Sequence, residues 1–130
     1  MKPQKNKKQT AKPQQSESAL QINCVKWFDY QYPHYRLNLF SIPNEGARTK
    51  KNGARMKMQG RRRGVADMFL AVSNITSLKI GLFIEFKTMT GKQKKEQHDF
   101  ELVVTAQGYD YEIVRDFDTF INVINQYLNN

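Results

Sequence analysis

The sequence predicts one α/β domain, with its elements in the order helix, three strands, helix, strand and helix. Its 130 residues, of which 39% are hydrophobic, suffice for one hydrophobic core, and a second domain is not expected. Apolar residues recur with helical spacing over 17–30 and 117–128, whereas they follow strand-like patterns in several shorter runs between these stretches. These two periodicities carry the prediction of the fold class.

The run Gly81-Leu82-Phe83-Ile84-Glu85-Phe86-Lys87 is an apolar strand that ends in charged residues. Because side chains along a strand alternate between its two faces, Glu85 and Lys87 are predicted to lie on the same face. A carboxylate and an ammonium next to buried residues are costly unless they are paired or hold a metal. The strand end is therefore a candidate functional site, the alternative being a strand that simply emerges into solvent.

A hairpin places a second carboxylate at this strand end. Two further strands are predicted over 37–42 and 65–72, and a loop over 73–79 joins the latter to the strand 80–87. A turn centred near Thr76 sets Asp67 opposite Glu85, and directly opposed residues have Cβ atoms about 4.5–5.5 Å apart. Two carboxylates at that distance can share a divalent ion.

The predicted helices supply two more candidate residues. Ser16 is predicted to cap a helix over 17–30, and Glu17 lies at the end of the core-facing stripe of this helix. Glu17 is expected either to point inward at the edge of the core or only to compensate the helix dipole. A helix over 96–107 places Gln97 at the top of its inward stripe, within reach of Lys87 or a bound phosphate, although a solvent-exposed first-turn Gln is the alternative. The residues predicted to form that inward stripe are Phe100, Val103, Val104 and Gln107.

The end of the chain is expected to be structural. A strand over 109–114 follows Gly108, and Asp116 caps a last helix whose apolar residues have helical spacing. That spacing indicates core packing or a dimer seam.

The net charge of +9 favours an anionic partner. The charge is concentrated in 1–15, which we expect to be a disordered basic arm, and in 48–63, expected to include a basic helix or helical loop over 47–59. Both segments lack acidic residues, which indicates phosphate contacts or, alternatively, solvated surface. The basic residues of the second segment are Arg48, Lys50, Lys51, Arg55, Lys57, Arg61, Arg62 and Arg63.

Several classes of protein are excluded by the same composition. No apolar run reaches the roughly 20 residues of a membrane-spanning helix, and the N-terminus lacks the hydrophobic segment of a secretion signal, so an intracellular protein with no membrane partner is expected. The single cysteine, Cys24, cannot form an internal disulfide, and two distant histidines make no zinc pattern.

The order of elements and five local motifs resemble the PD-(D/E)XK nucleases and, within that superfamily, the virus-type replication-repair nuclease (VRR-NUC) family. The resemblance covers about 16–128. The motifs are Glu17 with Gln21, Ile42-Pro43-Asn44-Glu45-Gly46-Ala47-Arg48, Gly64-Val65-Ala66-Asp67, Gly81-Leu82-Phe83-Ile84-Glu85-Phe86-Lys87, and Gly91-Lys92-Gln93 leading to Gln97. Ala66 replaces the usual Pro, and Lys94 or Lys95 lies near a common Ser, but neither position supplies a metal ligand.

The resemblance implies a restriction-endonuclease-like core in which helices flank a mixed four-stranded sheet, forming a nuclease domain over 16–130. It implies a Mg²⁺ or Mn²⁺ site made by Asp67, Glu85, the backbone carbonyl of Phe86 and Glu17. Lys87 would orient or deprotonate the attacking water, and Gln97 would position Lys87 or the phosphate. The residues expected to bind DNA are the basic residues of 48–63 together with Lys92, Lys94 and Lys95.

The implied activity is that of a structure-selective deoxyribonuclease, and compact family members resemble Holliday-junction resolvases that act as homodimers on branched DNA. The short chain resembles phage-borne members, for which the host cytoplasm is the expected location. Two alternatives remain: a nicking, flap or duplex nuclease, and a non-catalytic nucleic-acid-binding protein with a nuclease fold.

Overall fold

A computed structural model describes residues 15–43 and 50–129 of the chain. The helices are α1 (Glu17–Gln31), α2 (Lys50–Met58), α3 (Lys95–Ala106) and α4 (Phe117–Leu128), and a 3-10 helix, η1 (Pro33–Asn38), follows α1. The strands are β1 (Leu39–Ser41), β2 (Met68–Leu70), β3 (Leu82–Phe86) and β4 (Asp110–Val114). The predicted order of elements is confirmed, whereas almost all of the predicted basic arm lies outside the described residues.

The strands form a mixed four-stranded sheet, as predicted, and their order across it is β1-β2-β3-β4. β1, β2 and β3 pair antiparallel, and β4 joins parallel to β3. Met68 pairs with Ile84, and continuing this register by one residue sets Asp67 opposite Glu85. The predicted hairpin register is therefore the one that the structure has.

All four strands are shorter than predicted, and the first two lose half or more of their predicted length. Pro33 starts the tight turns of η1, so the first strand begins at Leu39 instead of at position 37. Beyond Leu70 each side of the hairpin bonds to its other neighbour: the amide of Ala71 donates to the carbonyl of Asn38, and the amide of Ile80 to that of Gly108. The predicted 65–72 strand is reduced to Met68–Leu70.

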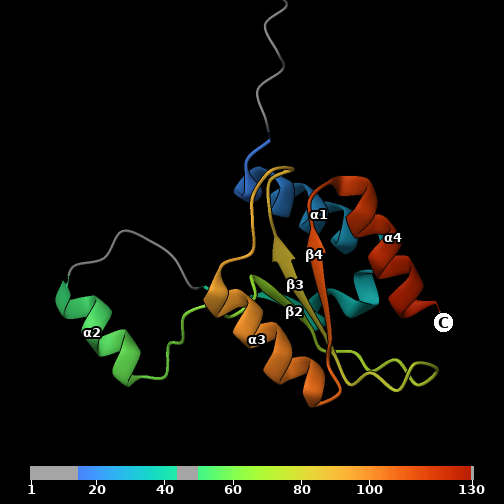
Figure 1. The fold of residues 1–130 in the computed structure, drawn as a ribbon. Helices are drawn as coiled ribbons and strands as arrows, with labels where there is room; N and C mark the ends of the chain where they lie inside the picture. The colour runs from blue at the N-terminus through green and yellow to red at the C-terminus, as the bar shows by residue number, and fades with distance from the viewer. Residues whose placement is uncertain (1–14, 44–49, 130) are drawn as a thin grey trace, which may run out of the picture.

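The principal core lies between the sheet and the helices α1 and α4 (Figure 1). Ser16 caps α1 by accepting a hydrogen bond from the amide of Ala19, and Asp116 caps α4 by accepting one from Thr119. The stripes that these caps orient bury Leu20, Cys24 and Phe28 from α1, and Phe120, Ile124 and Tyr127 from α4. The last helix is therefore core packing, as one of the two sequence interpretations had it.

The other face of the sheet is covered by α3 through aromatic rings. The ring of Phe100 meets that of Phe83 edge to face, with centroids 5.0 Å apart, and no α3 side chain is fully buried. The prediction that Val103 and Gln107 face inward is wrong, since both are exposed. Helix α3 touches the sheet along a stripe too narrow for them, and Gln107 lies beyond its last turn.

Helix α2 stands apart from the sheet and its covering helices (Figure 1). It confirms the predicted basic helix over the part of 47–59 that is described. No helix in 15–43 or 50–129 combines the length and the apolar character that crossing a membrane requires.

Candidate active site

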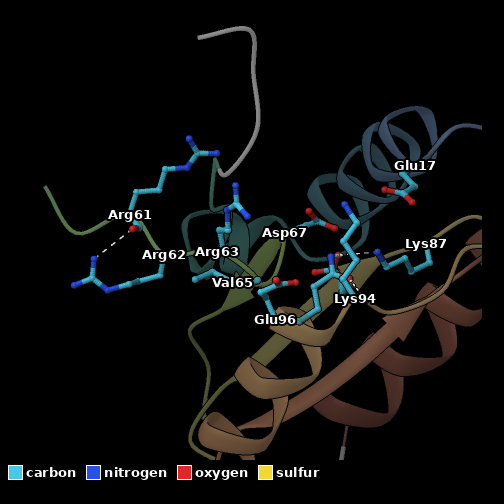
Figure 2. Close-up of a pocket in the computed structure, with 12 residues that line it drawn as sticks. Glu17, Arg61, Arg62, Arg63, Val65, Asp67, Lys87, Lys94 and Glu96 are labelled. Atoms are coloured by element: carbon cyan, nitrogen blue, oxygen red, sulfur yellow. Dashed lines mark hydrogen bonds and ion pairs between the residues drawn. The ribbon is translucent and has the colours of Figure 1, made fainter. Parts of the chain in front are cut away.

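A pocket of about 480 Å³ opens beside the end of β3. Figure 2 shows the side chains around it, which come from the loop before β2, from β3 and from the start of α3, with Glu17 contributed by α1. The lining residues are Glu17, Arg61, Arg62, Arg63, Gly64, Val65, Asp67, Glu85, Lys87, Lys94, Glu96 and Gln97. Each of the five residues predicted to be catalytic thus lines this pocket.

Asp67 is held at the start of β2 by its own backbone and by its side chain. Its carbonyl accepts a hydrogen bond of 2.8 Å from the amide of Ile42, which extends the β1–β2 ladder past the assigned strands. Its Oδ2 accepts a second bond, also 2.8 Å, from the amide of Phe86 on β3. Because that amide lies next to Glu85 in the chain, the bond fixes the two carboxylates at the same strand end.

Glu85 and Lys87 form a buried ion pair. Lys87 Nζ lies 3.8 Å from Glu85 Oε1, and their side chains are only 6% and 3% exposed. The backbone position of Lys87 is set by a bond from its amide to the carbonyl of Val114 on β4. Since removing one partner would leave a buried charge uncompensated, this pair is a costly feature for a fold to keep.

Gln97 contacts Glu85 rather than Lys87, which corrects the expected contact. The amide of Lys94, at the N-cap of α3, donates to Gln97 Oε1 at 2.8 Å. With its oxygen engaged there, the carboxamide presents its nitrogen, which donates to Glu85 Oε1 at 2.8 Å. The helix cap thereby decides which end of the Gln97 side chain faces the carboxylate.

Glu17 lines the pocket but is exposed, so the prediction of an inward position at the edge of the core is wrong. It occupies the first turn of α1, on the far side of the sheet from α3, and reaches the pocket only around the strand end. Among the described residues, no three His, Cys, Asp or Glu side chains gather closely enough to hold a metal ion by themselves.

The residues predicted to contact DNA divide between the pocket and other surfaces. Arg61, Arg62, Arg63 and Lys94 line the pocket, and the three arginines lie on the side away from Glu17 (Figure 2). Lys92 and Lys95 are exposed beside α3, and Lys95 pairs with Asp99 at 3.0 Å. Arg55 and Lys57 are exposed on α2. Arg48 and the side chains of Lys50 and Lys51 lie outside the described part of the chain.

The turn after β3 is held by Arg115, which the sequence did not single out, and by Gln93 of the fifth motif. Arg115 Nη1 donates to the carbonyls of Thr88 and Gly91, at 2.8 and 2.6 Å. Gln93 donates to the hydroxyl of Tyr111. Burial, together with the nearby charge of Glu85, raises the pKa of this hydroxyl to about 12, so it stays protonated. A lone Arg after a strand forms no pattern, and only the folded chain shows its role.

Glu96 lines the pocket but is absent from the predicted site. It is an exposed acid in the first turn of α3, where a carboxylate is favoured by the helix dipole. Such an acid is common at helix starts, which is why its position gave no functional signal.

No protein-family model matches the chain, and no curated protein matches it either. A solved structure described as a VRR_NUC domain protein is similar to it, with a TM-score of 0.76 at 20% sequence identity. The similarity covers 88% of this chain and 89% of that one. The chain therefore has the mixed α/β fold of a VRR_NUC domain, as its sequence motifs predicted.

Proposed function

We propose that the chain is a divalent-metal-dependent DNA endonuclease of the VRR-NUC family that cleaves branched DNA, in the manner of a Holliday-junction resolvase. The observation that carries the proposal is the pocket itself. Asp67 and Glu85 present carboxylates at one strand end, Lys87 is paired beside them, and basic side chains line the outer side. Hydrolysis of a phosphodiester requires this combination of oxygen ligands and positive charge.

The donor set fits Mg²⁺ or Mn²⁺, which prefer oxygen ligands. Asp67 and Glu85 would hold the ion together with the backbone carbonyl of Phe86, and Glu17 would complete the site from α1. Mg²⁺ usually binds proteins through one or two carboxylates and takes its other ligands from water and substrate phosphate. Among the described residues Glu17 is exposed and does not gather with Asp67 and Glu85 into a three-acid cluster, so these two carboxylates would be the principal ligands. When bound, the ion would supply an activated water and neutralise charge at the phosphate.

Lys87 would act on the attacking water or on the charge that develops at the phosphate. Its ammonium is almost fully buried and has Glu85 at 3.8 Å, so its position is restricted. A fixed cation in a poorly solvated pocket stabilises developing negative charge more strongly than one in water. Gln97 would serve as a positioning residue, because its side-chain nitrogen donates to Glu85.

The DNA would be gripped by its backbone. Arg61, Arg62, Arg63 and Lys94 line the pocket, and Arg55 and Lys57 on α2 extend the basic surface away from it. Lys92 and Lys95, and the basic residues at 48, 50 and 51, would add further phosphate contacts. Contacts of this kind position the substrate without reading its sequence. A junction has two equivalent strands to cut, so we propose that the chain acts as a homodimer.

The test compares cleavage of four-way junctions, forks, flaps and linear duplex, each with Mg²⁺, with Mn²⁺ and with EDTA. We expect cutting only with a divalent ion and a preference for branched substrates. Equal rates on linear duplex would refute junction selectivity and support the duplex or nicking nuclease. Binding without cutting under every condition would instead support the non-catalytic nucleic-acid-binding protein. Light scattering of the purified chain tests the dimer.

A further inference from the structure

The loop that carries Arg61, Arg62 and Arg63 is bounded by two glycines in the left-handed region. Gly60 has φ +101° and Gly64 has φ +85°. A residue with a side chain would be strained at either position, so in this respect the two glycines are equivalent. They differ in what surrounds them.

Gly64 lies directly against the backbone of α3. A Cβ atom at this position would be 2.3 Å from the carbonyl oxygen of Glu96 and 2.8 Å from the amide nitrogen of Gln97, too close for any side chain. A Cβ atom at Gly60 would meet nothing within 4 Å. Backbone therefore packs on backbone at Gly64 alone, and the contact joins the loop to the first turn of α3.

Two backbone carbonyls of α2 hold the loop from its other side. The amide of Arg61 donates to the carbonyl of Met56 at 3.0 Å, and Arg62 Nη1 lies 3.5 Å from the carbonyl of Lys57. The first turn of α3, by contrast, is fixed to the site through Gln97 and Glu85. A side chain at position 64 would thus push the loop outward rather than move the helix.

The docked loop adds three arginines to a pocket that also contains Lys94 and the buried Lys87–Glu85 pair. The loop has no acid of its own, although Glu17, Asp67, Glu85 and Glu96 line the same pocket. The arginines lie on the side of the pocket away from Glu17, where an anion can approach them (Figure 2). Arginine forks match phosphate oxygens, often with two hydrogen bonds to one group, so a phosphodiester backbone is the anion that fits.

We propose that Gly64 is the docking point that holds the Arg61–Arg63 loop at the pocket, where it binds the phosphates of the strand that the enzyme cuts. The inference rests on the proposed function, because it names how that substrate is held. It assigns to Gly64 a positioning role in substrate binding, separate from the chemistry of Asp67 and Glu85.

The test measures DNA binding without catalysis, in EDTA, as a function of salt. On a plot of log K against log salt, each phosphate contact makes the negative slope steeper by about 0.9, so losing three contacts lowers the magnitude of the slope by about 2.7. We expect Gly64→Ala to lower the slope by roughly that amount. Gly60→Ala, which introduces the same backbone strain without the collision, should keep the parent slope. A variant with Arg61, Arg62 and Arg63 all changed to Gln should match Gly64→Ala, and adding Gly64→Ala to it should change nothing further.

Equal slopes for Gly64→Ala and Gly60→Ala would overturn the proposal, as would a further fall in slope when Gly64→Ala is added to the triple Gln variant. If Gly64→Ala does not fold, hydrogen exchange of the parent chain decides instead. DNA should then slow exchange of the backbone amides of 61–64, and unchanged exchange there would refute the docking. A parent chain that binds DNA but does not cut it would refute the nuclease and leave the docking intact.

Discussion

Replacing Gln97 by Glu tests the centre of the site through stability alone, without any assumption about activity. In the parent chain the side-chain oxygen of Gln97 is engaged by the Lys94 amide, and its nitrogen lies 2.8 Å from Glu85 Oε1. Gln97→Glu keeps the first contact and turns the second into a meeting of two carboxylate oxygens. One of the two groups must then take up a proton or the contact must break.

The size of the effect follows from comparing two costs. Two unit charges 2.8 Å apart repel by about 6 kcal/mol at an effective dielectric constant of 20. Protonating a carboxyl of ordinary pKa 4.3 at pH 7 costs about 3.7 kcal/mol, since each pH unit is worth 1.36 kcal/mol. Proton uptake is cheaper, so the loss of stability at pH 7 is limited to about 3.7 kcal/mol, and attraction to Lys87 reduces it further.

The sign of the pH dependence is fixed by the same argument. The shared proton is bound in the folded state and released on unfolding, so the folded-state pKa is raised. The penalty is therefore absent below about pH 4.3 and grows by up to about 1.4 kcal/mol per pH unit until the raised pKa is reached.

Urea unfolding of the parent, Gln97→Glu and Gln97→Met between pH 5 and pH 8 measures this difference. The Met variant has a similar side-chain volume but loses both hydrogen bonds of Gln97 and adds no charge, so it should be destabilised by about 1–3 kcal/mol with no added titrating group. If Gln97→Glu follows the Met variant at every pH, Gln97 does not lie against Glu85 and the reasoning fails.

Three further predictions concern single side chains. Asp67→Asn and Asp67→Ala should both lower cleavage at least about 100-fold. In urea unfolding only the Ala variant should show a further loss of about 1–3 kcal/mol, because it leaves the Phe86 amide without its acceptor. Equal stabilities of the two variants would contradict this hydrogen bond. Cys24 is fully buried, and this burial, with a smaller effect from the charge of Asp116, raises the pKa of its thiol to about 12. A thiol reagent at pH 8 should therefore label Cys24 only at the rate of unfolding. Rapid labelling of the native chain would contradict this expectation. Arg115→Met should speed tryptic cleavage at Lys92 roughly tenfold, because the turn after β3 loses two charge-assisted hydrogen bonds. An unchanged rate would show that contacts other than those of Arg115 hold the turn.

The register of the hairpin was predictable because side-chain alternation leaves few choices. A shift by one residue would turn Met68 and Ile84 away from the core, so burial selects the pairing that also sets Asp67 opposite Glu85. The caps of α1 and α4 were predictable for a similar reason, since a Ser or Asp directly precedes each apolar repeat.

The partner of Gln97 was not predictable. Helical spacing placed the residue at the top of α3, but its choice of Glu85 over Lys87 depends on the amide of Lys94, which belongs to the helix cap. The same limit applies to Gly64, because the sequence shows that a glycine is present but not which backbone it approaches. Contacts between backbone groups leave little trace in the pattern of side chains.

The aromatic face of the sheet has a consequence for how the molecule comes apart. Helix α3 rests on rings such as Phe83 and buries no side chain completely, whereas α1 and α4 each bury three. Elements with few buried apolar contacts open at lower free energy than the rest of a protein, so α3 is expected to detach before the sheet and the opposite helices unfold. Because Gln97 leaves with it, gentle heating should disable the pocket while most of the secondary structure persists, and the working temperature limit would be set by one helix rather than by the whole fold.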